Sequence, residues 1–163
     1  MEKIYTILKE RFSFPDKLLF ANVATQSEIG PNIRTMRIYG MNEDGSLILI
    51  TKTMANKWKE LQENSLIALS IVSEDRSLQL ICRGHVLLEN GPSPQAEVYW
   101  ELIRPDLRET YERMENSAIP PTFGLVTVRP YFWEILELKI PHKESIKMQW
   151  HLQSGRWVKN NNL

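Results

Sequence analysis

The chain has 163 residues, a length typical of one domain that buries a core of its own. Its 20 basic and 20 acidic side chains balance, so it lacks the positive surplus that attracts nucleic acids and anionic membranes, and neither partner is expected. No apolar run reaches the roughly 18 residues of a membrane span, and the N-terminal segment carries charges where a secretory signal would be apolar.

The apolar pattern first predicts a short helix over 2–12, which is followed by a chain of strands and turns. A second short helix is expected over 55–64, between the third and fourth strands. The stretch 93–111 is mostly helical, and Pro105 in it either breaks a helix or opens a new one. Strands are predicted over 17–25, 33–39, 47–51, 66–72, 78–88, 124–128, 131–138, 147–152 and 156–158.

Many short strands separated by turns, with few helices, indicate a mainly β protein built on an antiparallel barrel. We expect a single domain over 1–163, with the N-terminal helix at 2–12. The barrel core would span about 17–138 and a C-terminal hairpin about 147–158. No repeat and no linker divides the chain.

Arg34 and Lys57 are the first candidate binding residues. Arg34 alternates with Met36 and Ile38 in the second strand, and an arginine among apolar neighbours needs either an anion, a salt bridge or a route to water. Lys57 falls in the first turn of the predicted helix, for which Thr53 is the expected N-cap. Because a lysine opposes the helix dipole there, a bound anion such as phosphate would explain it, although a solvated lysine is the simpler reading.

The fifth strand has two different faces. Leu80, Cys82 and Gly84 alternate on a core face, whereas Gln79 and Arg83 lie on a polar face that either meets solvent or lines a site. Cys82 is expected to be an inert core thiol. As the only cysteine it cannot form an intrachain disulfide, which suits a cytoplasmic protein. The three histidines show no metal-ligand spacing, and no metal site is expected.

One ordered set of residues spans this part of the chain: Gly30 to Arg37, Asp44-Gly45-Ser46-Leu47, Thr51, Asn56-Lys57, Leu61, Asn64, Gln79 and Gly84. In its order and spacing, this set resembles the pyridoxamine 5′-phosphate oxidase-like flavoproteins. The resemblance is best over 15–90 and thinner to about 138. It implies a six-stranded antiparallel split β-barrel, usually a homodimer, with FMN bound at the subunit interface.

By position in that family, Arg34 and Lys57 would contact the FMN phosphate. An arginine usually precedes the lysine, and here Asn56 takes its place, which leaves an amide contact without the charge. The C-terminal flavin tryptophan of the family corresponds to Leu136 or, with a small shift, to Trp133. The remaining cofactor contacts implied by the resemblance are Thr35, Met36, Arg37, Ile50, Thr51 and Gln79.

The substrate side departs from enzymes that oxidise pyridoxamine phosphate. This chain has Tyr39 where they have a lysine, Trp100 where they have a tyrosine and Arg108 where they have a serine. Only Arg104 matches, as their substrate-phosphate arginine. The candidate substrate contacts are therefore Trp100, Arg104 and Arg108, and the family's name-giving reaction is not expected.

Two functions follow from the resemblance, and a third remains open. The first is an FMN-dependent oxidoreductase with an unknown substrate, in which the flavin supplies the redox chemistry. The alternative is a non-catalytic flavin-binding or stress-response module that keeps the phosphate site alone. The third is a barrel that has lost the flavin or prefers another ligand, such as haem or a deazaflavin.

Overall fold

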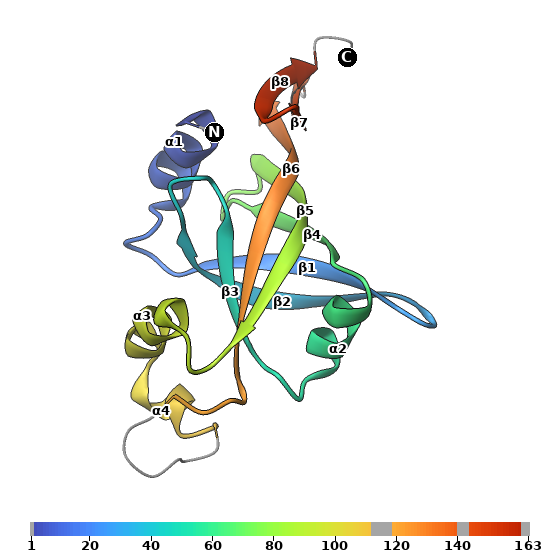
Figure 1. Cartoon of the computed structure of the whole chain (residues 1–163). Coiled ribbons are helices and arrows are strands. Elements are labelled where there is room, and N and C mark those ends of the chain that lie inside the picture. The colour runs from blue at the N-terminus through green and yellow to red at the C-terminus, as the bar shows by residue number, and fades with distance from the viewer. Residues whose placement is uncertain (1, 112–118, 140–143, 161–163) are drawn as a thin grey trace.

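The computed structural model describes residues 2–111, 119–139 and 144–160. Within these ranges, eight strands form one antiparallel sheet in the order β3-β2-β1-β4-β5-β6-β7-β8, and four short helices flank it (Figure 1). The strands are β1 (Leu19–Ser27), β2 (Gly30–Met41), β3 (Leu47–Lys52), β4 (Leu66–Val72), β5 (Leu78–Asn90), β6 (Phe123–Lys139), β7 (Glu144–Gln153) and β8 (Arg156–Asn160). The helices are α1 (Glu2–Phe12), α2 (Asn56–Glu63), α3 (Pro94–Leu102) and α4 (Pro105–Arg108).

The sheet closes on itself because β3 also pairs with β6. Strands β1 to β6 therefore make a six-stranded antiparallel barrel, and β7 and β8 extend from it as a hairpin. This confirms the predicted split barrel. Ser154 and Gly155 connect the hairpin with φ of 47° and 78°, the left-handed pair that a two-residue turn between antiparallel strands requires.

Strand β6 corrects the prediction of two separate strands over 124–128 and 131–138. It runs unbroken through Pro130, which lies opposite Gly84 beside a register shift in β5. A proline has no N–H to donate to a ladder, so it is tolerated at such an irregularity. Gly84 is needed there, because a Cβ on it would lie 2.6 Å from the carbonyl oxygen of Arg129.

The helical stretch after β5 is two helices. Ser93 caps α3 by accepting a hydrogen bond from the N–H of Ala96, and Pro105 occupies the first turn of α4. Of the two roles considered for Pro105, the structure thus shows the opening of a new helix.

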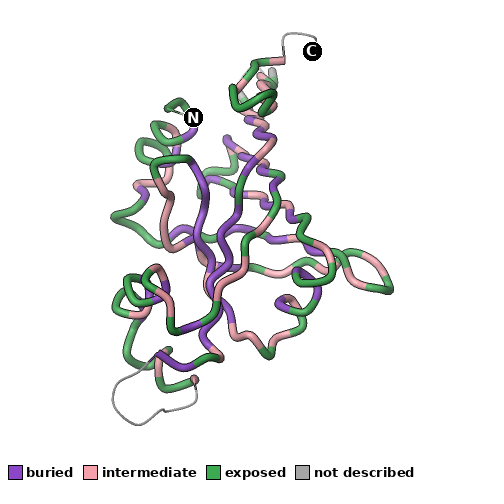
Figure 2. Tube along the Cα trace, viewed as in Figure 1, coloured by how far each residue is buried: buried purple, intermediate pink, exposed green. Residues whose placement is uncertain are grey.

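Two apolar cores hold these elements together, and Figure 2 shows buried residues following the strands through the centre of the molecule. The larger core fills the barrel and includes Leu8 of α1, Trp58 of α2 and Trp133 of β6. The smaller core lies between the outer side of β3 and β6 and the helix α3; its members are Ile48, Ala96, Tyr99, Ile103, Ile119, Phe123 and Leu125. Among the described residues no helix is long and apolar enough to cross a membrane.

Candidate functional site

Arg34 lies on the inner side of β2, near one end of the barrel. It stands opposite Val23 of β1, and its neighbours on the same face, Met36 and Ile38, are buried. Its guanidinium donates to the hydroxyl of Thr25 and forms an ion pair with Glu60 of α2 at 3.0 Å. The salt-bridged arginine considered from the sequence is therefore what the structure shows.

Glu60 is the residue that the sequence reasoning missed. Its side chain is only 8% exposed, and its two carboxylate oxygens accept hydrogen bonds from Thr25, from Asn32 at 2.8 Å and from Arg34. Burial acts to raise the pKa of Glu60, but these hydrogen bonds and the charge of Arg34 outweigh it, so the net pKa is lowered. The carboxylate is therefore charged at neutral pH.

Lys57 lies one helical turn before Glu60. Its amine has no hydrogen-bond or ion-pair partner within the described part of the chain. Burial, followed by the charge of Arg34, lowers the pKa of Lys57, and Glu60 raises it in part. Arg34 and Lys57 thus come from different elements to the same end of the barrel and repel each other there.

The start of α2 corrects the predicted cap. Ala55, not Thr53, is the N-cap residue, and it makes no side-chain capping bond. The hydroxyl of Thr53 instead donates to the carbonyl of Pro121, at a long 3.5 Å. The first N–H groups of α2 therefore lack a side-chain acceptor, and Asn56 beside them is exposed.

These groups fit a phosphate in type and charge. Two cations close together favour an anion, and the uncapped start of α2 adds N–H donors and the positive end of a dipole. Glu60 reduces this fit, because its carboxylate forms an ion pair with Arg34 and offsets the positive charge of that side chain.

Thr35 and Gln79 lie on the outer face of the sheet, at the two ends of one polar row. The Thr35 hydroxyl donates to Asn22 at 3.1 Å, Asn22 stands opposite Ser70, and the Gln79 amide donates to Ser70 at 2.8 Å. The row crosses β2, β1, β4 and β5. The structure thus links two predicted cofactor contacts that are distant in sequence, through two residues that the sequence reasoning did not select.

The other β2 contacts face in different directions. Met36 points into the barrel core, so only its backbone is available to a ligand. Arg37 points outward and stacks on Tyr39, with 4.4 Å from its guanidinium carbon to the ring centroid. Its Nε is buried and finds no hydrogen-bond partner among the described residues.

Ile50 and Thr51 lie on opposite sides of β3. Thr51 is buried, whereas Ile50 packs on the outside, against the smaller core. Trp100 joins the same core from α3 and meets the rings of Tyr111 and Phe123 at 5.6 and 5.1 Å between centroids. Ile50 and Trp100 are therefore brought to one aromatic cluster.

The two candidate substrate arginines differ. Arg108 reaches back over Trp100, 5.7 Å from its ring centroid, donates to the carbonyl of Glu101 at 2.8 Å and pairs with the Glu101 carboxylate at 3.3 Å. Arg104 pairs with Asp106 at 2.6 Å, with 68% of its side chain exposed. Both arginines are thus paired with acidic residues, and only Arg108 lies beside Trp100.

The remaining candidate residues either lie in the barrel core or do not gather into a binding site. Trp133 is fully buried inside the barrel, which removes it as a flavin contact, whereas Leu136 stands opposite Gln79. Cys82 is also fully buried, and burial raises the pKa of its thiol. Within the described ranges no three His, Cys, Asp or Glu side chains gather as metal ligands do.

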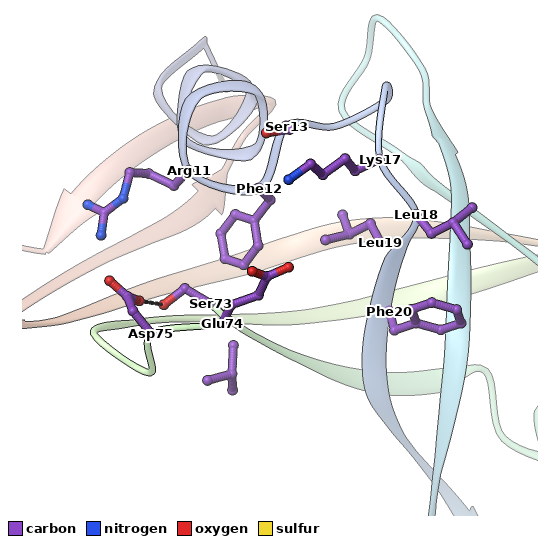
Figure 3. Close-up of a pocket in the computed structure, with 11 residues that line it drawn as sticks. Arg11, Phe12, Ser13, Lys17, Leu18, Leu19, Phe20, Ser73, Glu74 and Asp75 are labelled. Carbon is purple, nitrogen blue, oxygen red and sulfur yellow. Dashed lines mark hydrogen bonds between the residues drawn. The ribbon is translucent and has the colours of Figure 1, made fainter.

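A separate pocket of about 430 Å³ lies between the segment after α1 and the turn joining β4 to β5 (Figure 3). The charged ends of Lys17 and Glu74 extend toward each other beside the ring of Phe12, and all three residues line the pocket. The Lys17 amine is balanced by the Glu74 carboxylate, so this pocket does not favour an anion. In this it differs from the end of the barrel that holds Arg34 and Lys57.

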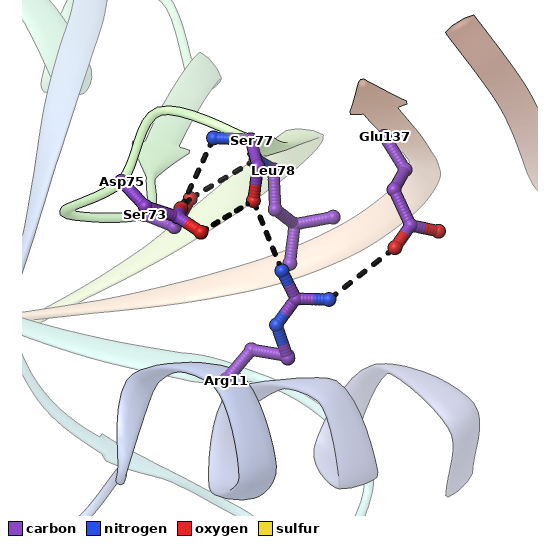
Figure 4. Close-up of polar contacts among 6 residues, drawn as sticks. All are labelled: Arg11, Ser73, Asp75, Ser77, Leu78 and Glu137. Atoms are coloured by element: carbon purple, nitrogen blue, oxygen red, sulfur yellow. Dashed lines mark hydrogen bonds and ion pairs between the residues drawn. The ribbon is translucent and has the colours of Figure 1, made fainter. Parts of the chain in front are cut away.

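The wall of this pocket is fixed by a polar network (Figure 4). Asp75 accepts from the hydroxyls of Ser73 and Ser77, at 2.5 and 2.7 Å, and these bonds lower the pKa of Asp75 to about 2. Arg11 of α1 lies between Ser77 at 3.1 Å and Glu137 of β6 at 3.3 Å. The network ties α1 to the barrel and has a structural role.

No known family profile matches the sequence, and no curated protein matches it. Solved structures, in contrast, include several that are similar to this chain. A pyridoxamine 5′-phosphate oxidase-related, FMN-binding protein from Nostoc punctiforme has a TM-score of 0.77 and 19% identity, over 98% of this chain and 94% of the other. PhzG from Burkholderia lata, in complex with tetrahydrophenazine-1-carboxylic acid, has a TM-score of 0.77 and 12% identity, over 98% and 88%.

A protein from Clostridium acetobutylicum related to general stress protein 26, of the pyridoxinephosphate oxidase family, is also similar. Its TM-score is 0.62 and its identity 17%, over 87% of this chain and 93% of the other. At these identities the likeness is one of fold, and the resemblance seen in the sequence is confirmed at that level. The chain has the split-barrel fold of the pyridoxamine 5′-phosphate oxidase-related proteins.

Proposed function

We propose that the protein binds FMN, with Arg34 and Lys57 as its phosphate ligands. The observation that carries this proposal is the meeting of the two cations at one end of the barrel, where burial and, after it, the charge of Arg34 lower the pKa of Lys57. An anion placed between them would relieve that repulsion. The likeness of fold to an FMN-binding protein supports the choice of flavin among phosphate-bearing ligands.

The other predicted cofactor contacts offer different chemical groups to the flavin. Thr35 and Gln79 supply hydroxyl and amide groups on the outer face, and Arg37 supplies a guanidinium Nε that has no hydrogen-bond partner in the described part of the chain. Met36 offers backbone groups alone. Ile50, Thr51 and Asn56 complete the proposed set. When bound, the flavin would supply the redox chemistry, so the protein needs to bind and orient it.

Titration with FMN and with riboflavin, followed by flavin fluorescence, tests the phosphate site. Lys57→Gln should weaken FMN binding by about tenfold, as expected for loss of a charge-assisted contact, and leave riboflavin within about twofold. Lys59→Gln is the matched control, because Lys59 lies on the same helix with 76% of its side chain exposed. Equal FMN affinity in the wild type and Lys57→Gln would reject the assignment. Mass spectrometry of the ligand released from purified protein separates FMN from haem or a deazaflavin.

We also propose that the protein is a cytoplasmic homodimer that pairs through the outer face of β1, β2 and β4. This face exposes large apolar side chains: Phe20 is 51% exposed, Ile33 72% and Val72 46%. Exposed apolar side chains on one sheet face, here crossed by the polar row of Thr35, Asn22 and Ser70, are typical of an interaction surface that joins apolar and polar contacts. Phe20→Glu should produce monomers in light scattering, whereas Val98→Glu on α3 should not. A wild type that is monomeric at micromolar concentration would contradict the dimer.

The second candidate function is a flavin-binding module without a substrate. The position of Arg104 favours it, because this residue is paired with Asp106 at the surface rather than gathered with Trp100 and Arg108. Steady-state turnover with a reductant and a panel of substrates distinguishes the two functions. Turnover no faster than with free FMN would support the module, and faster turnover would support an oxidoreductase.

A further inference from the structure

Glu60 is a buried carboxylate inside the proposed phosphate site, and neither the sequence nor the proposed function gives it a role. It lies one turn after Lys57 on α2 and contacts the guanidinium of Arg34 at 3.0 Å. Its side chain is 8% exposed and that of Arg34 is 20% exposed. The interaction is therefore shielded from water and stronger than a surface ion pair.

The carboxylate already receives the kind of donors that a phosphate would use. One oxygen accepts from Asn32, and the other accepts from both Thr25 and Arg34. Because Glu60 is charged at neutral pH, it cancels the charge of Arg34, and Lys57 alone supplies the net positive charge of the cluster. A phosphate dianion thus meets a weaker positive electrostatic field than Arg34 and Lys57 would create in the absence of Glu60.

We propose that Glu60 is a specificity-determining residue of this site, an internal counter-charge that limits the affinity for the flavin phosphate. The inference rests on the proposed function, since it concerns the same phosphate site. It implies that FMN is held loosely enough to exchange. It also implies that the preference for FMN over riboflavin is modest, because the two ligands differ in the phosphate that Glu60 opposes.

A role for Glu60 in orienting Arg34 would have the opposite effect, and one substitution separates the two. Glu60→Gln removes the charge but keeps a side-chain oxygen that accepts from Thr25 or Arg34. If Glu60 only oriented Arg34, this variant would bind FMN as the wild type does, or less tightly. If Glu60 opposes the phosphate, the variant binds FMN more tightly.

The experiment is a fluorescence titration of the full chain with FMN and riboflavin. Glu60→Gln should bind FMN about tenfold more tightly, from removal of one like charge beside the proposed phosphate position, with riboflavin within about twofold. Glu63→Gln makes the same charge change on the same helix, where Glu63 pairs with Lys59 at 3.8 Å, and should change FMN affinity little. Thr25→Val keeps both charges and should not produce the gain.

Unchanged or weaker FMN binding by a folded Glu60→Gln variant would overturn the inference, as would an equal gain in Glu63→Gln. Glu60→Met, of similar length, is a second variant that removes the charge if the glutamine does not fold. The wild type supplies a further check, since a preference for FMN over riboflavin above about a thousandfold would contradict a counter-charge. If the wild type and both Glu60 variants fail to bind any flavin, the proposed function is rejected together with this inference. If Glu60→Gln binds FMN and the wild type does not, the inference that Glu60 opposes the phosphate is supported.

Discussion

Removal of the Arg34 guanidinium should destabilise the barrel far more than removal of a comparable surface arginine. Arg34→Met removes the cation from the carboxylate of Glu60, whose side chain is only 8% exposed in the wild type. Breaking one side of a buried pair costs about 3–5 kcal/mol, and the partial exposure of Arg34 places the expected loss near the lower end, about 3 kcal/mol. With a urea slope of about 2 kcal/mol per molar, the unfolding midpoint should fall by about 1.5 M.

Equilibrium urea unfolding at neutral pH, followed by circular dichroism, measures this loss. Arg11→Met is the matched control, because its 3.3 Å pair with Glu137 is 38% and 35% exposed and should contribute at most about 1 kcal/mol. The double variant Arg34→Met/Glu60→Met should be more stable than Arg34→Met, since it leaves no unpaired buried charge. A midpoint shift below about 0.5 M in Arg34→Met, or strictly additive losses in the double variant, would refute the reasoning.

Three further predictions concern the core and its pH dependence. Gly84→Ala should lower the Tm by about 3–9 °C in calorimetry, because its Cβ would lie 2.6 Å from the carbonyl oxygen of Arg129; an unchanged Tm would show that β6 gives way freely. Cys82 should react with a thiol reagent only on unfolding, because it is fully buried and burial raises its pKa; labelling of the native protein at the unfolded rate would contradict this. The pKa of Glu60 is lowered on folding, so its contribution to stability is present at neutral pH and is lost as the pH falls below the unfolded value of about 4.5. Urea midpoints of the wild type should therefore fall more steeply in acid than those of Glu60→Gln, and parallel curves would exclude Glu60 as the cause.

Local sequence patterns predicted a mainly β, antiparallel barrel, and the family resemblance implied the six-stranded split barrel that the structure shows. Alternating apolar residues and turn residues predicted the strands, and the helical spacing over 2–12 agrees with α1. The unbroken β6 was missed because Pro130 reads as a strand end. It is tolerated there through its place opposite Gly84, in a strand distant along the chain. Such pairing depends on tertiary register, which single-sequence patterns do not contain.

The proposed phosphate site was likewise predictable from the local sequence only in part. Arg34 and Lys57 each conflict with local preference, as an arginine on a core face and a lysine in a first helical turn, and the ordered match to the family identified them as candidate phosphate ligands. The partner of Arg34 was not recognisable, because Glu60 on α2 has an ordinary helical sequence environment and meets Arg34 only when α2 packs across the end of the barrel. Local chemistry marks which side chains need a partner. Long-range packing selects that partner, and here it placed a carboxylate where an anionic ligand was expected.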